Sequence, residues 1–215
     1  AALRSIGDSE PRLRSTVLAL RGMRPPRFPT LFEAFARVVP FQQLSLDAGV
    51  VIVARMVDRF GPRLEHAGRC FFGFPAAAEI ARADIRSLRS CGLSARKAGV
   101  LRDIARSIDA GRLTEARLSV MSTPDALRTL TELPGIGPWS AALVLLRGLG
   151  RTDVFPPGDV GAMRGLRTLL RMGPRARFER RVERFGDRRG YVYFCALGES
   201  LRARGLIHAP GPDDH

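Results

Sequence analysis

The spacing of apolar residues along the chain predicts helices almost throughout. Apolar side chains recur three or four residues apart, as in Ala98, Leu101, Ile104 and Ile108 within the segment from Ser94 to Ala110. The strict alternation that is typical of half-buried strands is essentially absent, and glycine and proline fall between the helical segments. The pattern predicts an all-α protein of about ten helices joined by short connections.

Capping residues and prolines bound the predicted helices. Thr30 and Ser94 each precede an apolar-periodic segment, as N-cap residues do. Pro25 and Pro26 end the first segment, because consecutive prolines cannot continue a helix. The expected helices cover residues 9–22, 30–38, 45–60, 75–82, 84–90, 94–110, 123–133, 138–149, 159–170, 174–185 and 190–203. Residues 67–75, rich in glycine and aromatic side chains, are expected to form a loop.

These segments fit a single domain over residues 1–215 that is divided into two helical lobes. We expect one lobe over residues 30–110 and the other over residues 111–205 together with 1–29. With 45% hydrophobic residues the chain can bury a sizeable core. It contains no apolar run long enough to predict a transmembrane helix.

The charge balance is strongly basic. The chain carries 35 lysine and arginine residues against 21 aspartate and glutamate residues, a formal net charge of +14. Such a surplus indicates a polyanionic partner, for which DNA, RNA and an acidic membrane surface all qualify. Lys97 is the only lysine. Arginine suits phosphate because its planar fork donates two hydrogen bonds. A GC-rich genome also favours arginine over lysine, but it does not explain the excess of basic residues.

Three cysteines, Cys70, Cys91 and Cys195, lie far apart in the sequence. An iron–sulfur cluster needs clustered thiolates, and a zinc site needs closely paired cysteines or histidines, so neither is expected. Free, buried thiols suit a reducing compartment. We expect a bacterial cytoplasm, or the nucleus if the source is eukaryotic.

Two glycines separated by one apolar residue, Gly135 and Gly137, lie in an expected hairpin over residues 131–141. Glycine permits the positive φ angles of a tight turn, and the missing Cβ atoms let another backbone approach. Amide groups at the start of the following helix point outward and carry partial positive charge. The segment therefore predicts a grip on phosphate that is independent of base sequence, although an ordinary turn between helices has the same short pattern.

The full string Leu133-Pro-Gly-Ile-Gly-Pro-Trp-Ser-Ala141 closely resembles the helix-hairpin-helix of the HhH-GPD DNA glycosylase superfamily. A second mark of that superfamily is a loop rich in glycine and proline that ends in aspartate, and Val154-Phe-Pro-Pro-Gly-Asp159 matches it. Gln42-Gln-Leu-Ser45, and a Gly-Leu-Ser-x-x-Lys pattern ending at Lys97, are similar to motifs of the 3-methyladenine DNA glycosylase II branch. The resemblance extends over roughly residues 25–205 and implies the helical HhH-GPD fold.

The resemblance implies a DNA glycosylase in which Asp159 carries the chemistry. A damaged base is rotated out of the duplex, and its N-glycosidic bond then breaks with positive charge developing on the sugar. A nearby carboxylate stabilises that charge and orients or deprotonates water. Asp159 also stands where an ordinary N-cap residue would stand, and the two roles are compatible.

Position 139 bears on whether the DNA strand is also cut. Bifunctional relatives carry a lysine there, whose amine attacks the sugar and forms a Schiff base. This chain has Trp139, its only tryptophan. The resemblance thus implies a monofunctional enzyme that removes alkylated purines, such as 3-methyladenine, and leaves an abasic site. A glycosylase for deaminated or mismatched bases and a non-catalytic DNA-binding module are the alternatives.

Further roles follow from the resemblance alone. Gln42 and Gln43 would wedge into the gap left by the flipped base, unless they form an ordinary polar loop. The other assignments are a base pocket of Trp139, Leu143, Tyr191 and Phe41, and DNA-backbone contacts from Gly135, Ile136, Gly137, Ser140 and Arg189. The carbonyl groups of Thr131, Leu133 and Ile136 would hold a structural Na⁺ or K⁺, and no other cofactor is expected. The expected partner is double-stranded DNA with a damaged base. We expect the protein to act as a monomer and not to bind a membrane.

The chain departs from the branch in its expected base pocket. Arg188 stands where an aromatic residue is usual, Leu143 where a tyrosine can occur, and Phe41 in place of a glycine. Aromatic walls stack on cationic alkylated purines, so the range of lesions is open. The rings of residues 71–74 and of Trp139 either line such a pocket or belong to the core.

Overall fold

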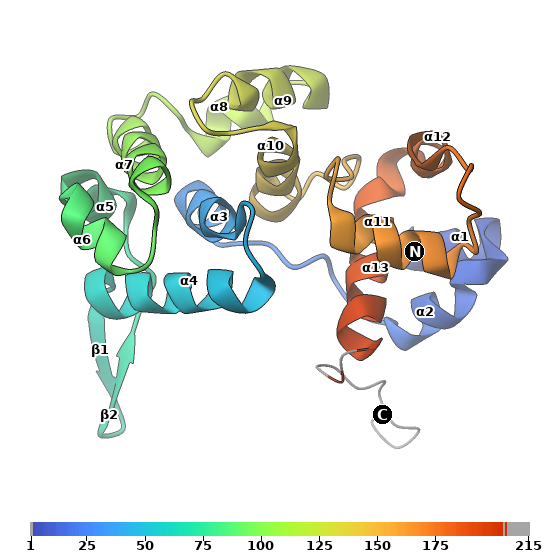
Figure 1. Ribbon diagram of the computed structural model, residues 1–215, viewed down its shortest axis with the longest axis horizontal. Helices are drawn as coiled ribbons and strands as arrows, with labels where there is room; N and C mark the ends of the chain where they lie inside the picture. Colours follow the sequence, from blue (N-terminus) through green and yellow to red (C-terminus); the bar gives the residue numbers. More distant parts are fainter. Residues whose placement is uncertain (1, 204, 206–215) are drawn as a thin grey trace. The chain divides into compact units, whose positions relative to one another are not determined.

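The computed structural model describes residues 2–203 and 205, and most of them are helical (Figure 1). The all-α class is confirmed, with more and shorter helices than predicted because segments such as 9–22 are broken by turns. The α-helices are α1 (Ala2–Ser9), α2 (Arg14–Ala19), α3 (Leu31–Val38), α4 (Leu46–Phe60), α5 (Ala77–Arg82), α6 (Ile85–Ser90), α7 (Ala95–Asp109), α8 (Glu115–Ser119), α9 (Thr123–Thr131), α10 (Pro138–Val144), α11 (Val160–Leu169), α12 (Phe178–Glu183) and α13 (Arg189–Ala203). Short 3₁₀ turns span Pro11–Leu13, Val39–Phe41 and Gly186–Arg188, and a π-helical turn, Leu145–Leu149, extends α10.

Local capping accounts for several helix starts. The side chains of Thr30, Ser45 and Ser94 each accept a hydrogen bond from the backbone N–H three residues further on. Helix α9 is capped in the same way by Ser122, one residue before the Thr123 start that the sequence suggests. These starts depend on neighbouring residues only, which is why the sequence places them closely.

The chain divides into two compact units whose boundaries differ from the predicted lobes. Residues 28–149 form one unit, here called the hairpin unit, and residues 1–27 with 150–215 form the other, the aspartate unit. The expected boundary near residue 110 is therefore wrong. Helix α10 packs against both α3 and α9, so the segment after residue 110 completes the core of the hairpin unit. Gly111, with φ +68°, makes only a turn within that unit.

The core of the hairpin unit forms where α3 to α7 meet. Phe32 of α3, Met56 of α4, Ile80 of α5 and Leu101 of α7 belong to one cluster of buried side chains. Helix α7 also contacts the turn Val39–Phe41 that follows α3. This packing brings the first turn of α7 next to the two glutamines that come after that turn.

A two-stranded antiparallel hairpin replaces the predicted loop. Strand β1 (Arg63–His66) pairs with β2 (Arg69–Phe72), and Arg63 lies opposite Phe72 in the register. Ala67 and Gly68 connect the strands with φ angles of +48° and +71°, the signs that a type I′ turn requires. All eight strand residues are exposed. The strands lack an apolar–polar alternation because neither face is buried.

The aromatic residues of this region separate into two environments. Phe71 and Phe72 are exposed on β2. Phe74, in contrast, packs against Phe32 with ring centroids 6.5 Å apart, next to the core of the hairpin unit. Of these three rings, only that of Phe74 therefore packs against the core, as one of the two interpretations of the sequence expected.

Helices α11 and α13 pack along each other in the aspartate unit, where they are coloured orange and red in Figure 1. A Cβ atom on Gly165 of α11 would lie 2.8 Å from the carbonyl oxygen of Ala196 on α13. Glycine therefore lets the two helix backbones come this close. Helices α1 and α2 contact α13 as well. The arrangement sets the start of α11, where Asp159 lies, beside one face of α13.

Candidate functional site

The predicted hairpin forms the connection between α9 and α10. Gly135 has φ +81°, and a Cβ atom there would lie 2.4 Å from Cγ2 of Val100 on α7. Ile136 is buried, and its N–H donates to the carbonyl oxygen of Leu133 over 3.0 Å. Glycine at position 135 is thus required by the fold of the protein itself.

Gly137 lies in a different environment from Gly135. Its φ of −90° suits any residue, and a Cβ atom there would meet nothing within 4 Å. Gly137 is exposed and is the N-cap of α10, and no side chain caps this helix. The packing of the protein therefore does not require glycine at position 137.

The two glutamines after α3 have separate environments. The Nε2 atom of Gln42 donates to the carbonyl oxygen of Gly135 and to Oγ of Ser140, both over 2.9 Å. Ser140 is buried on α10. Gln43 is exposed and has φ +55°, a conformation that is uncommon for residues other than glycine. Since Gln42 is already bonded to the hairpin, Gln43 is the stronger wedge candidate.

Lys97, on α7, also holds the loop that contains Gln42. Its Nζ atom donates to the carbonyl oxygens of Pro40 and Gln42 over 3.0 and 2.5 Å. Burial lowers the pKa of this ammonium group from its ordinary value. The segment before Gln43 is therefore fastened to α7 by Lys97 and to the hairpin by Gln42. Spacing alone does not reveal this contact, because it joins residues more than fifty positions apart.

The residues predicted for the base pocket in this unit lie on two elements. Trp139 is half-buried and Leu143 is buried, and a spacing of four residues puts both on one face of α10. The ring of Phe41 lies over Gly49 of α4, where a Cβ atom would approach its Cδ1 to 2.4 Å. Phe41 is half-buried in this position. Their role in binding a base stays a prediction.

Asp159 lies at the N-cap of α11, at the end of the Pro-Pro-Gly loop. Gly158, with φ +73°, makes the turn that precedes it. The Oδ1 atom of Asp159 accepts a hydrogen bond from the N–H of Ala162 over 2.9 Å. Its Oδ2 atom accepts one from the hydroxyl of Tyr193 over 3.1 Å. The carboxylate is half-buried, so it caps the helix while part of the residue still meets solvent.

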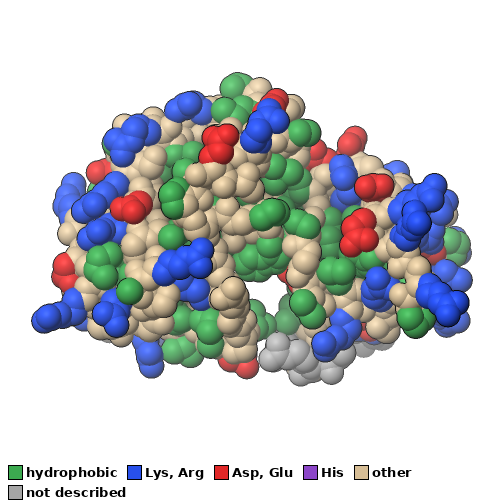
Figure 2. All heavy atoms as spheres, turned by 45° about the horizontal axis from the view of Figure 1, so that its top comes forward, with side chains coloured by type: hydrophobic (Ala, Val, Ile, Leu, Met, Phe, Trp, Pro, Cys, Tyr) green, Lys and Arg blue, Asp and Glu red, His purple; other side chains and the backbone are tan. Residues whose placement is uncertain are grey.

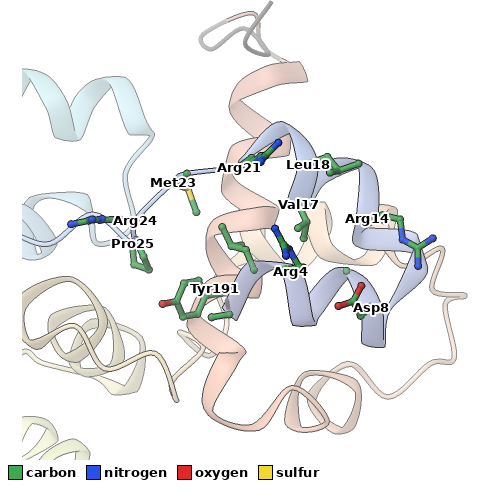
Figure 3. Close-up of a pocket in the computed structure, with 14 residues that line it drawn as sticks. Arg4, Asp8, Arg14, Val17, Leu18, Arg21, Met23, Arg24, Pro25 and Tyr191 are labelled. Atoms are coloured by element: carbon green, nitrogen blue, oxygen red, sulfur yellow. The ribbon is translucent and has the colours of Figure 1, made fainter. Parts of the chain in front are cut away.

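Tyr193 is a site residue that sequence reasoning missed. It is buried on α13, and its ring meets that of Phe155 edge-on, with centroids 5.5 Å apart. The predicted pocket residue Tyr191 lies two positions earlier on the same helix and therefore on a different face. It lines a separate cavity of about 500 Å³ with residues such as Arg4 and Asp8 (Figure 3). Tyr193 lies three residues before Ala196, the residue of α13 that Gly165 approaches, and therefore on the face of α13 that packs against α11.

Two arginines at the start of α13 have defined contacts. The Nε atom of Arg189 donates to the carbonyl oxygen of Gly186 over 2.9 Å. Arg188, which stands where an aromatic residue is usual, donates from Nη1 to Oγ of Ser5 over 2.6 Å. Arg188 therefore links α1 to the start of α13 within the aspartate unit, and the predicted contact of Arg189 with DNA is untested.

The cysteines only partly match expectation. Cys91 and Cys195 are free and buried, whereas Cys70 is exposed on β2. Burial raises the pKa of the Cys195 thiol to about 12. Within residues 2–203 and 205, no three His, Cys, Asp or Glu side chains come together in a way that could hold a metal ion. None of the helices described above is both long and apolar enough to cross a membrane.

Comparison with known proteins identifies related sequences and folds. Residues 36–186 match the model of the HhH-GPD superfamily base excision DNA repair protein. A DNA-3-methyladenine glycosylase of Bacillus subtilis (strain 168) is 32% identical over 167 residues, which are 78% of this chain and 55% of that protein. The structure of a 3-methyladenine DNA-glycosylase from Archaeoglobus fulgidus superposes with a TM-score of 0.79 at 30% identity, over 95% of this chain and 70% of that one.

A third comparison concerns the fold alone. A Schizosaccharomyces pombe 3-methyladenine DNA glycosylase, solved in complex with abasic DNA, superposes with a TM-score of 0.71 at 24% identity, over 98% of each chain. The chain spans about half the length of the curated relatives it matches, 55% and 47% of two Bacillus subtilis proteins. The family match includes the hairpin, the glutamine loop and Asp159. The chain therefore belongs to the HhH-GPD superfamily of base excision DNA repair proteins.

Proposed function

We propose that the protein is a monofunctional DNA glycosylase that hydrolyses the N-glycosidic bond of alkylated purines in double-stranded DNA. The observation that carries the proposal is the Asp159 carboxylate, which the N–H of Ala162 and the hydroxyl of Tyr193 orient through different oxygens. Identities of 32% and 30% to two DNA-3-methyladenine glycosylases support alkylated purines as substrates. The net charge of +14 supports a DNA partner.

The proposed reaction needs only water and the carboxylate. The bond between C1′ of the sugar and the base nitrogen breaks, and its electron pair leaves with the base. Asp159 stabilises the positive charge that develops on the sugar, and a water oxygen then bonds to C1′. The proton released by this water passes to the carboxylate or to solvent. An alkylated purine is already cationic, so it departs as a neutral base without prior protonation.

The DNA strand stays intact in this proposal. A lyase needs an amine nucleophile at the reacting sugar, and Trp139 occupies the position that a lysine holds in bifunctional relatives. The only lysine, Lys97, donates two hydrogen bonds to backbone carbonyls of its own unit. Its ammonium group is therefore engaged in holding the glutamine loop.

The hairpin would grip one DNA strand and hold a monovalent cation. Thr131, Leu133 and Ile136 fit such a site, because only Leu133 accepts a backbone hydrogen bond from the described part of the chain. The carbonyl oxygens of the other two keep both lone pairs for Na⁺ or K⁺. When bound, the cation would supply positive charge for a phosphate beside Gly137. The expected form is a monomer acting where the genome lies, in a bacterial cytoplasm or a eukaryotic nucleus.

Excision from a panel of duplex oligonucleotides tests the function. Each duplex carries one lesion, including 3-methyladenine, 7-methylguanine, hypoxanthine, uracil and a mismatch. We expect release of alkylated purines by the wild type, and little release by the Asp159→Asn variant. Preferential release of uracil or of a mismatched base would replace the proposed substrate class.

Borohydride trapping tests the monofunctional assignment on the same duplexes. A Schiff base is reduced to a stable covalent complex, so the wild type should yield none while it accumulates alkali-labile abasic sites. A trapped complex would overturn the assignment. Unchanged excision by Asp159→Asn would overturn the role of the carboxylate.

A further inference from the structure

Helix α12 in the aspartate unit segregates its charges. Four arginines spaced three or four residues apart follow one face of the helix and its caps: Arg177, Arg180, Arg181 and Arg184. Phe178 and Val182 turn inward and are buried. Glu179 and Glu183, four residues apart, form a row of their own beside the arginine row, and Glu183 is three residues from Arg180. A solvated helix usually mixes opposite charges on its surface, whereas this face carries one sign only.

Two further arginines complete a hollow of about 830 Å³ with this face. Arg12 comes from the turn before α2, and Arg171 follows the end of α11. Arg171 has φ +49°, the left-handed conformation in which glycine is the usual residue after a helix end. Figure 2 shows basic side chains gathered over the aspartate unit, on the right of the view. Six arginines, here called the arginine hollow, thus line one concave surface.

The members of the arginine hollow fall into two groups by their contacts. Arg181 forms an ion pair with Glu10, and Arg12 donates from Nη1 to the carbonyl oxygen of Leu170 over 3.1 Å. Arg171 and the other three have no acidic side chain within ion-pair distance among the residues that the structure describes. Two arginines are therefore fixed in place by the fold, while four keep their hydrogen-bond donors for another molecule.

The arginine hollow is separate from the carboxylate site. Asp159 precedes α11 and Arg171 follows it, with the ten residues of the helix between them. A helix of that length measures about 15 Å. Arginines near the end of α11 also interact favourably with its helix dipole. That effect explains Arg171 but not the row of arginines on α12. An arrangement of six cations around one hollow instead matches an extended polyanion.

We propose that the arginine hollow binds phosphate groups of the DNA backbone, outside the contacts made by the hairpin and the carboxylate. Arginine forks donate paired hydrogen bonds to phosphate, and four uncommitted forks can span successive phosphates. This inference rests on the proposed function, because DNA is the polyanion that the protein would meet. It adds a second, sequence-independent holding point that lies in the aspartate unit.

The test is the salt dependence of binding to an undamaged 30-base-pair duplex, measured by fluorescence anisotropy. In one variant Arg177, Arg180 and Arg184 are changed to Gln, which keeps the two anchored arginines. The control variant changes Arg82, Arg86 and Arg89 on α5 and α6 to Gln, so its net charge falls by the same amount. Each lost phosphate contact lowers the slope of log K against log salt by about 0.9. We expect the first variant to lose about two to three slope units and at least tenfold in affinity at low salt. The control should lose less than one unit.

Equal slopes for the two variants would overturn the proposal. A variant in which the same three arginines become lysine should keep most of the slope, and its thermal unfolding shows whether the mutated helix is folded. Calorimetry with pyrophosphate distinguishes the source of the phosphate: tight binding that the Gln variant loses, with an unchanged DNA slope, would assign the hollow to a free anion and overturn the DNA proposal. Because undamaged DNA is used, the slope change would still appear if the protein excised no lesion at all.

Discussion

The hairpin and the aspartate loop are both short turns rich in glycine and proline that lead into a helix, yet they are built differently. The hairpin packs through Gly135 against Val100 of α7 and is bonded by Gln42, which donates to the carbonyl oxygen of Gly135 and to Ser140. Asp159 is one charged group at a helix N-cap, and its hydrogen bonds include those from Ala162 and Tyr193 of its own unit. Under the proposed function, shape and backbone amides would hold the DNA, whereas a single carboxylate would supply the chemistry. Substitutions in the two regions should therefore affect different measurements.

Asp159→Asn should have the largest effect. The amide keeps the N-cap of α11, because asparagine caps helices as well as aspartate does. It removes the negative charge, and we expect the single-turnover excision rate to fall by about 10² to 10⁴-fold. The dissociation constant for duplex DNA should change less than twofold, by fluorescence anisotropy. A loss of affinity equal to the loss of rate would contradict the separation of the two regions.

Paired alanine variants of the two hairpin glycines should separate fold from grip. Gly135→Ala must strain a positive φ and push Val100 aside, so the free energy of unfolding should fall by about 1–3 kcal/mol. Gly137→Ala meets no protein atom within 4 Å and should leave stability unchanged in urea titrations. Its DNA affinity should nevertheless fall about tenfold, because a Cβ atom would keep the phosphate from the α10 amides. Unchanged affinity would mean that the DNA does not approach this residue.

Lys97→Met should lower excision by about tenfold at saturating DNA, since the carbonyls of Pro40 and Gln42 would lose their common donor. Lys97→Arg keeps a charged donor and should retain more activity. If Lys97 does not hold the glutamine loop in place, the two variants will excise equally well.

The pKa of Lys97 adds a pH test to the same pair. Burial lowers that pKa in the folded protein, so the unfolded chain binds the proton more tightly. The contribution of this group to stability therefore rises as the pH climbs from the folded pKa towards the ordinary value of 10.5. Excision by the wild type should decline at alkaline pH before that of Lys97→Arg, whose guanidinium stays charged. Superimposable pH profiles would argue against a role for the ammonium charge.

Tyr193→Phe should have the smallest effect. It removes the hydrogen bond to Oδ2 of Asp159 but keeps the ring against Phe155. We expect a three- to tenfold slower single-turnover rate, in line with about 1 kcal/mol for one hydrogen bond. Tyr191→Phe is the matched control, because that side chain lines another cavity, and its rate should equal that of the wild type. A larger effect at Tyr191 would return that residue to the base pocket.

The sequence by itself determined the helical class, several helix starts and the positions of the two loops that match the superfamily. Thr30, Ser45 and Ser94 cap their helices through amides three residues away. The hairpin glycines and Asp159 are likewise recognisable because their roles depend on the residues immediately around them. Features of this kind depend on a short stretch of chain and need no contact with a distant segment.

Only the tertiary structure decided which of two similar neighbours makes which contact. Gln42 is distinguished from Gln43 by a carbonyl 93 positions away, and Tyr193 from Tyr191 by a carboxylate 34 positions away. The unit boundary at residue 149 likewise depends on α10 packing against α3, because the local break at Gly150 looks like the other breaks between helices. The short strands β1 and β2 escaped prediction because both of their faces meet solvent, which leaves no alternation to read. Helical packing decides which face of each helix is buried. Contacts between distant segments therefore distinguish residues that look alike in the local sequence.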